Sequence, residues 1–320
     1  MNMETPLTRL IKYVFLQTLQ IPALLCLIFI FYCVYREPQF RSLNNHAMLI
    51  ILFCCCFLLL TCELPVTLIY FHHDSLEIQS DHLCYYWLFI NYTIEGITTV
   101  MMAFASTERF VLIFNGNFIT GSQQRKLWFH YIPMLFCCMI VISWYIVLIF
   151  IYPRENAFDY TMFLCNSACY QANVLLGTLD WIGSVLLPVI IVILFNILLL
   201  IRAILHKRRL NLPLNWRRTR KMTIQLLAVV FVFLFTQIPL SIFAIIRLAF
   251  IPDFLNNILT LWYYYTPYLI FLLTPFAYLI TTKEVSKYLV KLKPCKPRRV
   301  NGLQMNTIRQ IRHNDTLRFD

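Results

Sequence analysis

The hydrophobic pattern of the chain consists of long apolar runs separated by short polar segments. Each run is near or above the roughly 20 residues that a helix needs to cross a bilayer. The pattern predicts seven membrane-spanning helices, at about 11–35, 46–71, 84–114, 127–152, 173–205, 221–250 and 258–281. The first run is longer than the apolar core of a signal peptide and lacks a small-residue cleavage site, so we expect it to remain as a helix.

Composition supports a membrane protein. Hydrophobic residues make up 60% of the 320 positions and charged residues 13%, which leaves too little polar surface for a soluble domain of this size. Since the loops are short and no internal repeat is visible, we expect an all-α membrane protein, a seven-transmembrane helix bundle. The expected domains are a bundle over 1–293 and a disordered basic cytoplasmic tail over 294–320.

The distribution of basic residues predicts the orientation. If the N-terminus is outside, 23 of the 27 Lys and Arg residues lie on the inner side, where the positive-inside rule requires them. Only Arg9, Lys12, Arg154 and Arg247 lie outside. The net charge of +12 therefore reflects a membrane surface, and no nucleic-acid partner is expected.

Three of the twelve cysteines lie at the outer side. Cys84 begins the third helix, while Cys165 and Cys169 belong to the longest outer loop. An oxidising compartment favours a disulfide from Cys84 to this loop, with either Cys165 or Cys169 as the partner. Cysteines inside the apolar runs are expected to be small buried residues rather than metal ligands.

Several motifs occur in a characteristic order. Cys84 lies twenty-five residues before Arg109, Pro188 lies in the fifth helix, and Phe233 with Pro239 lies in the sixth. The seventh contains Thr274-Pro275-Phe276-Ala277-Tyr278. Together, over roughly 11–293, these residues resemble the rhodopsin-like (class A) G-protein-coupled receptors, and most closely the divergent invertebrate type that resembles FMRFamide-peptide receptors.

The resemblance implies a plasma-membrane receptor that binds an extracellular ligand and activates a heterotrimeric G protein at its cytoplasmic face. Glu108-Arg109-Phe110 matches, with Phe110 in place of Tyr, the Asp/Glu-Arg-Tyr end of helix three, where the acid neutralises the Arg until helix six swings outward. A buried Arg near the membrane boundary is costly without such a partner. The expected switch residues are Glu108, Arg109, Phe110, Pro239, Pro275 and Tyr278.

Five positions depart from the family pattern. The resemblance leads us to expect a weakened inactive lock, an altered transmission route and no intramembrane sodium site. The departures are Thr219 for the acid of helix six, Gln237 for Trp, Asn196 for Tyr, Cys55 for the acid of helix two and Thr274 for Asn.

Glu63, Glu95 and Asp180 lie in or near the outer halves of apolar helices. Because an ionised side chain in lipid costs at least about 2.5 kcal/mol, we expect them to face the bundle interior. With Tyr92, Trp181, Trp262 and Tyr265, they predict an electronegative, aromatic cavity for a cationic ligand. The candidate ligand-binding residues are Glu63, Asn91, Glu95, Asp180, Gln237 and Arg247.

A structural role is the alternative for the three acids, through hydrogen bonds to Thr98, Asn91 or Tyr side chains. The family's amine-binding Asp falls at Asn91, which disfavours a small biogenic amine and favours a peptide with an Arg or a free amine. The seventh run has no Lys for a retinal Schiff base. No cofactor is implied.

Two other classes of membrane protein fit the sequence less well. A zinc hydrolase needs histidines gathered among the helices, but here they are split between the two faces. We therefore expect neither a metal site nor an enzyme. An ion- or proton-coupled transporter is the alternative function, yet the second half of the chain does not mirror the first.

The segment after the seventh run alternates Lys with apolar residues. This pattern predicts a short amphipathic eighth helix on the membrane surface over 283–293. Cys295 follows it and is a candidate for palmitoylation.

Overall fold

The computed structural model describes residues 5–36, 46–120, 124, 127–152, 156–209, 227–242, 245 and 265–281. All regular secondary structure in these ranges is helical. The expected eighth helix over 283–293, the tail, Thr219, Arg247, Trp262 and Cys295 lie outside the described residues.

Seven apolar helical segments follow one another along the chain. The first is α1 (Pro6–Arg36) and the third is α5 (Asp81–Thr120). The second, fourth and fifth are each built from three consecutive helices. The second consists of α3 (His46–Leu58), η1 (Leu59–Glu63) and α4 (Leu64–His73), and the fourth of η2 (Leu127–Tyr131), α7 (Ile132–Ile146) and η3 (Val147–Ile151). The fifth consists of α8 (Val174–Trp181), η6 (Ile182–Leu186) and α9 (Leu187–Arg209). The last two are Leu227–Ile242 and α12 (Thr266–Thr281).

Five of these segments are long and apolar enough to cross a membrane, and two shorter apolar helices accompany them in the described part of the chain. Many large apolar side chains on α1, α7 and α9 are exposed. In a soluble protein such surfaces would aggregate, whereas in a bilayer they contact lipid chains. The predicted all-α membrane bundle is confirmed.

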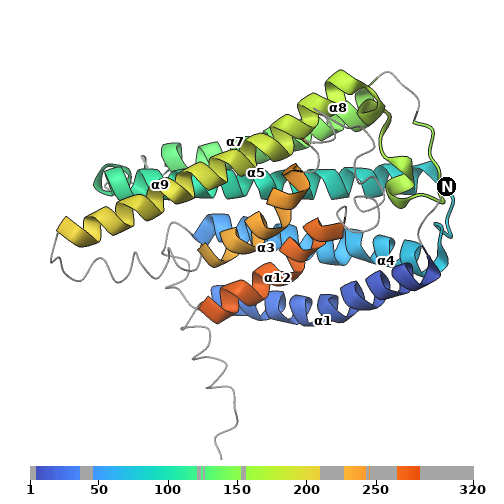
Figure 1. Cartoon of the computed structure of the whole chain (residues 1–320), viewed down its shortest axis with the longest axis horizontal. Helices are drawn as coiled ribbons and strands as arrows, with labels where there is room; N and C mark the ends of the chain where they lie inside the picture. Colours follow the sequence, from blue (N-terminus) through green and yellow to red (C-terminus); the bar gives the residue numbers. More distant parts are fainter. Residues whose placement is uncertain are drawn as a thin grey trace, which may run out of the picture. The chain divides into compact units, whose positions relative to one another are not determined.

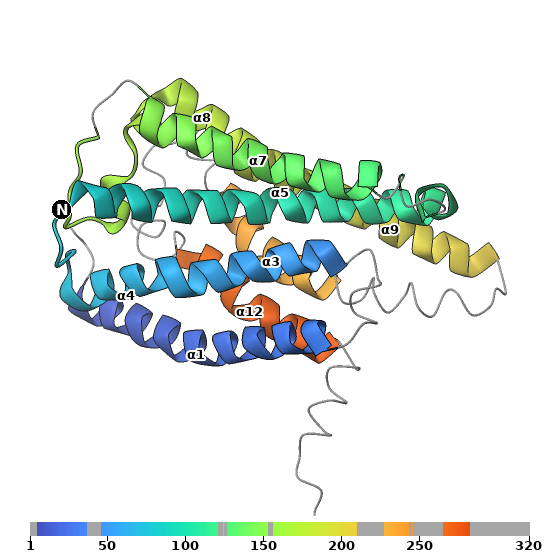
Figure 2. The ribbon, with the colours of Figure 1, turned by 180° about the vertical axis from the view of Figure 1, so that it is seen from behind.

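Helix α5 lies at the centre of the bundle. It packs against α7 and α9 on one side and against α3 and η1 on the other, and both views show it between these helices (Figures 1 and 2). Helix α1 packs against α12, α4 and α3. Because α5 contacts most of the bundle, side chains on its several faces meet partners from different helices.

One close approach between α5 and α7 depends on a glycine. A Cβ atom at Gly96 would lie 2.9 Å from the Tyr145 ring and 3.0 Å from Val141 Cγ1. Small residues allow such approaches between membrane helices, where van der Waals packing drives association.

Every π-helical segment in the described chain ends two residues before a proline. The segments η1, η2, η3 and η6 precede Pro65, Pro133, Pro153 and Pro188, respectively. A proline ring clashes with the carbonyl one turn earlier and removes an N–H donor. At η1, η2 and η6 the extra residue of the π-helical turn relieves this conflict and the helix continues, whereas η3 is the last helical segment of its span.

At η1 the backbone group freed by proline has found a side chain. In this segment the N–H of Leu64 donates to the carbonyl of Leu59, five residues earlier. By the same pattern the carbonyl of Leu60 would accept from Pro65, which has no N–H. Gln20 of α1 donates its Nε2 to the Leu60 carbonyl instead, at 2.7 Å. The bond satisfies a buried acceptor and joins α1 to the second span.

Candidate functional site

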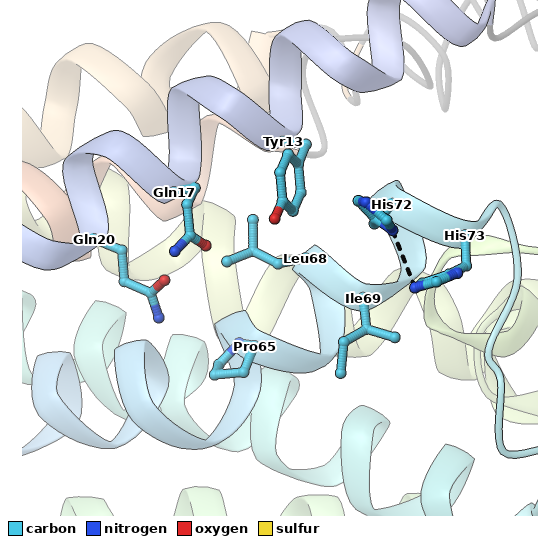
Figure 3. Close-up of a pocket in the computed structure, with 8 residues that line it drawn as sticks. All are labelled: Tyr13, Gln17, Gln20, Pro65, Leu68, Ile69, His72 and His73. Carbon is cyan, nitrogen blue, oxygen red and sulfur yellow. Dashed lines mark hydrogen bonds between the residues drawn. The ribbon is translucent and has the colours of Figure 1, made fainter.

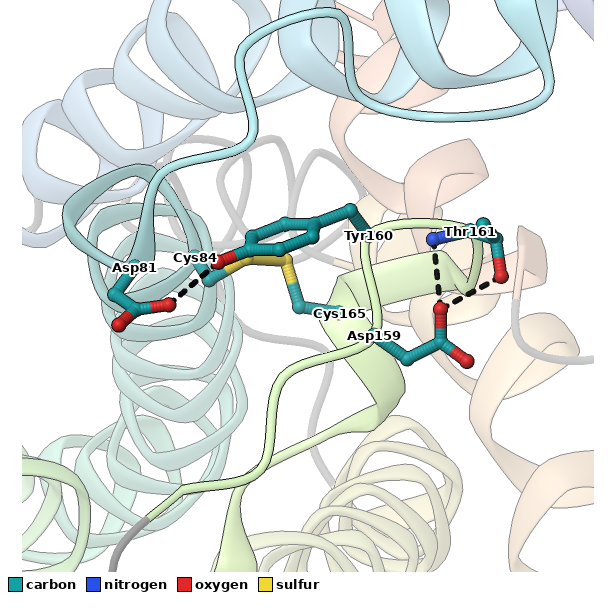
Figure 4. The surroundings of a disulfide bond; sticks show 6 residues. All are labelled: Asp81, Cys84, Asp159, Tyr160, Thr161 and Cys165. Carbon is teal, nitrogen blue, oxygen red and sulfur yellow. Dashed lines mark hydrogen bonds between the residues drawn. A yellow bond between two sulfur atoms is a disulfide. The ribbon is translucent and has the colours of Figure 1, made fainter.

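The outer end of α5 is linked by a disulfide to the loop between the fourth and fifth spans. Cys84, in the first turns of α5, is bonded to Cys165, with the two Cα atoms 5.8 Å apart. Both side chains are fully buried. Figure 4 shows the bond beside the Tyr160 ring. The predicted disulfide is confirmed, and its loop partner is Cys165 rather than Cys169.

Polar contacts hold the same loop against the bundle. Tyr160 Oη donates to Asp81 Oδ1 at 2.6 Å, and the Leu76 N–H donates to the Tyr160 carbonyl at 3.0 Å. The hydroxyl and the N–H of Thr161 donate to Asp159 Oδ1, at 2.6 and 2.9 Å. These two bonds, the hydroxyl first, lower the pKa of Asp159. The turn that carries Tyr160 is therefore stabilised at neutral pH (Figure 4).

Phe163 of the outer loop packs against aromatic rings of the bundle. It begins η4 (Phe163–Asn166), and its ring centroid lies 4.8 Å from that of Tyr265 and 5.5 Å from that of Trp87. Four consecutive non-glycine residues, 164–167, have φ between 51° and 71°. This left-handed backbone is strained, and the disulfide at the second of these residues holds it in place.

Glu63, at the end of η1, is a fully buried hydrogen-bond centre. Its Oε1 accepts from four side chains of α4, α5 and α12: Tyr268 Oη at 2.6 Å, Thr67 Oγ1 at 2.8 Å, Trp87 Nε1 at 2.9 Å and Asn91 Nδ2 at 3.1 Å. The bonds join the second, third and seventh spans. Four protein donors on one oxygen are typical of a structural polar group, while Glu63 Oε2 has no hydrogen bond within the described residues.

Asp180 of α8 is bonded in a similar way. Its Oδ1 accepts from Trp144 Nε1 and Ser184 Oγ, both at 2.9 Å, and its Oδ2 accepts from Tyr170 Oη at 3.0 Å. The carboxyl group is buried and joins the fourth and fifth spans to the outer loop. The geometry therefore favours a structural role for Asp180 as well as for Glu63.

Glu95 differs from the other two acids. It lies on α5, is partly buried, and faces the side-chain amide of Gln237 in the sixth span. Gln237 is fully buried, and apart from this contact with Glu95 neither its Nε2 nor its Oε1 has a hydrogen-bond partner within the described residues. One turn later, the buried Ser241 hydroxyl also lacks a partner in this part of the chain. Gln237 and Ser241 are therefore buried polar groups whose hydrogen-bonding capacity the described part of the protein does not fully use.

Lys12 brings a positive charge to the outer half of the bundle. It is buried on α1, with its Nζ 4.0 Å from the centroid of the Tyr265 ring and 5.6 Å from that of Phe71. Such cation–π contacts stabilise a cation away from water. The sequence predicted a cavity that was electronegative except near Arg247, and Lys12 changes this expectation on the α1 side.

The inner end of α5 carries Glu108-Arg109-Phe110. The Arg109 side chain is buried, and the Phe110 ring packs 5.2 Å from the ring of Phe195 on α9. The Glu108 carboxyl group contacts His130 Nδ1 in η2, the start of the fourth span. His130 is thus a partner of Glu108 that the sequence did not suggest.

Neighbouring switch positions also lie inside the bundle. Asn196 of α9 donates its Nδ2 to Ser106 Oγ of α5 at 2.9 Å. Tyr278 of α12 is buried, with its ring 4.9 Å from that of Phe53.

Within the described ranges, no three His, Cys, Asp or Glu side chains are grouped as metal ligands.

Comparison with known protein families gives one match. The family described as 7 transmembrane receptor (rhodopsin family) matches residues 25–278, which is most of the chain. The chain belongs to the rhodopsin family of seven-transmembrane receptors. No curated protein matches it individually.

Family membership establishes a multi-pass membrane receptor of class A. This is a receptor family and not a family of enzymes, and its members in general have a G protein and an extracellular ligand as partners. The matched region begins within α1 and ends at Tyr278 of α12, so it includes five of the helical segments whole and part of the first and the last. The FMRFamide-type subtype stays a prediction, because no individual relative supports it.

Several residues of the receptor's site were not found by sequence reasoning. Tyr268, Trp144, Tyr170 and Phe163 are aromatic residues among many in the chain, and no spacing pattern distinguishes them. Lys12 had a signal that could have been used. A Lys one and a half turns inside an apolar helix needs a partner or a water-filled surrounding, for the same reason as the three acids.

Proposed function

We propose that the receptor binds an extracellular peptide in the outer half of its bundle and activates a heterotrimeric G protein at its cytoplasmic face. In this proposal the receptor lies in the plasma membrane with its N-terminus outside and its C-terminus inside. The orientation rests on the position of 23 of the 27 Lys and Arg residues.

The observation that carries the ligand proposal is the contrast between Glu95 and the other two acids. Glu63 Oε1 and both oxygens of Asp180 accept hydrogen bonds from protein donors, whereas Glu95 contacts the Gln237 amide, which has no other hydrogen bond in the described residues. A cationic group of the ligand, such as an Arg side chain or a free amine, would pair with Glu95 and leave the Gln237 amide for a peptide group. Asn91 is already bonded to Glu63, so a small amine held there is disfavoured.

The FMRFamide-type resemblance indicates which peptides to try first. Cells expressing the receptor are exposed to a panel of C-terminally amidated peptides that contain Arg, including Phe-Met-Arg-Phe-amide, and calcium and cyclic AMP are recorded. A response that requires the receptor supports the proposal. If no peptide acts and no Gα subunit exchanges nucleotide while the receptor is at the cell surface, the proposal is wrong.

Replacing Glu95 with Gln is expected to weaken the most potent peptide of this panel by ten- to a hundred-fold. The substitution removes the charge but keeps the shape, and a charge-assisted hydrogen bond contributes about 1.5–3 kcal/mol. Glu77→Gln in the exposed first outer loop is the matched control and should not change potency. Unchanged potency in Glu95→Gln would remove Glu95 from the ligand site.

Arg109 is the proposed contact for the C-terminal helix of the Gα subunit, after Glu108 is released and the sixth span moves outward. The Arg109→Ala receptor, purified with the G protein that responds best, is expected to catalyse nucleotide exchange roughly tenfold more slowly, which corresponds to about 1.4 kcal/mol. Arg9→Ala, at the opposite end of the bundle, is the control. Equal exchange by Arg109→Ala and the unmodified receptor would contradict this role.

A further inference from the structure

A groove between α1 and α4 lies apart from the sites described above. Its volume is about 400 Å³, within the range of small-ligand sites. Figure 3 shows the side chains that line it, among them Tyr13, Gln17 and Gln20 of α1 and Ile69, His72 and His73 of α4. Neither Glu95 nor the Glu63 centre contributes to its lining.

The groove follows the helices through one leaflet of the membrane. From Tyr13 to Gln20 the rise along α1 is about 10 Å, and from Pro65 to His73 along α4 it is about 12 Å. One leaflet of hydrocarbon is about 15 Å thick. Ile69 on the groove wall is exposed, and so are Val14 and Ile21 on α1. The groove therefore opens where apolar side chains meet lipid.

Two of the polar side chains on the α1 side of the groove make no hydrogen bond to the described part of the protein. Gln20 is bonded to the Leu60 carbonyl, but within the described residues neither the Gln17 amide nor the Tyr13 hydroxyl makes a hydrogen bond. Polar groups on a lipid-facing surface are costly unless another molecule satisfies them.

The two histidines add a further donor. His73 Nε2 lies 3.1 Å from the Glu77 carboxyl oxygen and 3.0 Å from His72 Nδ1. Either ring is able to donate in the bond between the two histidines, and the bond uses one ring N–H. The histidine that accepts in this bond keeps an N–H on its other ring nitrogen, so the pair retains a donor for a ligand. No acidic residue lines the groove, so its chemistry suits a ligand rich in acceptors.

We propose that this groove binds a glycerophospholipid of the outer leaflet. The phosphate and ester oxygens accept from the remaining ring N–H of the His72–His73 pair, Tyr13 Oη and Gln17 Nε2, and one acyl chain follows Ile69 and the exposed apolar face of α1. A phospholipid fits because it brings acceptors at headgroup depth and a chain at the depth where the groove opens to lipid. The leaflet follows from the proposed orientation, whereas the binding itself does not depend on it.

The test measures lipid retention by the purified full-length receptor. After lipid removal in detergent, palmitoyl-oleoyl-phosphatidylcholine is titrated and bound lipid is counted by native mass spectrometry. We expect one molecule to bind more tightly than the rest, and Gln17→Leu combined with Tyr13→Phe to weaken it roughly tenfold through two lost hydrogen bonds. Thr18→Val, a matched polar-to-apolar change at an exposed neighbouring position of α1, should retain the unmodified affinity.

Two further probes separate the lipid from its parts. Dioleoylglycerol, which lacks the phosphate, and glycerophosphocholine, which lacks the chains, should each bind at least tenfold more weakly than the phospholipid. Tyr13→Phe alone keeps the ring beside His72 and should weaken binding about threefold even if the double variant does not fold. Unmodified affinity in Tyr13→Phe and the double variant, or equal binding of glycerophosphocholine, would overturn the proposal.

Discussion

Replacing Cys165 with Ser is expected to remove most of the receptor from the cell surface. The disulfide closes a chain segment of 81 residues, for which loop-closure entropy gives roughly 4.5 kcal/mol. Helices already inserted in the membrane restrict the unfolded chain, so we expect a loss of about 2–4 kcal/mol. The left-handed turn at residues 164–167 also loses its covalent restraint, and Phe163 leaves the rings of Tyr265 and Trp87.

Two comparisons make this prediction specific. Cys84→Ser removes the same bond from the other side and should behave like Cys165→Ser, and the double variant should be no worse than either one. Cys169→Ser leaves the bond intact and should reach the surface normally. The amount of receptor at the surface is measured by antibody labelling of an N-terminal epitope in intact cells. The temperature of thermal unfolding is measured on the purified protein. Normal surface levels for Cys165→Ser would show that the disulfide is dispensable.

Replacing Glu63 with Leu is expected to destabilise the receptor by at least about 3 kcal/mol. The substitution removes the acceptor of four buried donors at once, and each donor left unsatisfied costs about 1–3 kcal/mol. Because Thr67 and Tyr268 lie 3.1 Å apart and are able to bond each other, the total is smaller than four full penalties. The variant should unfold at a clearly lower temperature in detergent and be retained inside cells.

Glu63→Gln tests whether the acceptor oxygen or the acidic group is needed. The amide keeps one oxygen in the position of Oε1, so three or four of the bonds survive and the loss should be about 1–2 kcal/mol. Glu77→Gln, in the exposed first outer loop, should not change the unfolding temperature. If Glu63→Leu unfolded at the temperature of the unmodified receptor, the hydrogen-bond centre would not contribute to stability.

The fold could be read from the sequence to a large extent, because hydrophobic run length alone decides whether a helix crosses a membrane. The seven expected runs correspond to the seven helical segments of the structure, although their ends differ. The third segment begins at Asp81, whose acidic side chain favours a helix N-terminus, rather than at 84. The π-helical turns were not expected, although the prolines that follow them were visible in the sequence.

In the candidate site, only the cysteines of the disulfide and the charged residues were predictable from the sequence. Cys84 needs a partner at the same membrane surface, and few loop cysteines were available, so two choices remained. The three acids were found because charge in lipid is costly at any position. Whether each acid is saturated depends on donors such as Trp144 of the fourth span or Tyr268 of the seventh, which are 36 and 205 residues away from the acids that they bond.

The sequence by itself determined that this protein is a multi-span membrane bundle, and the order of its motifs indicated the receptor family. Both follow from properties of single segments: apolar length, charge and spacing. Only the tertiary structure decided that Cys165 pairs with Cys84, that Glu63 and Asp180 accept from several protein donors while Glu95 contacts the Gln237 amide, and that His130 contacts Glu108. These contacts join residues of different helices, and their geometry is set by how the helices pack, which no local pattern encodes.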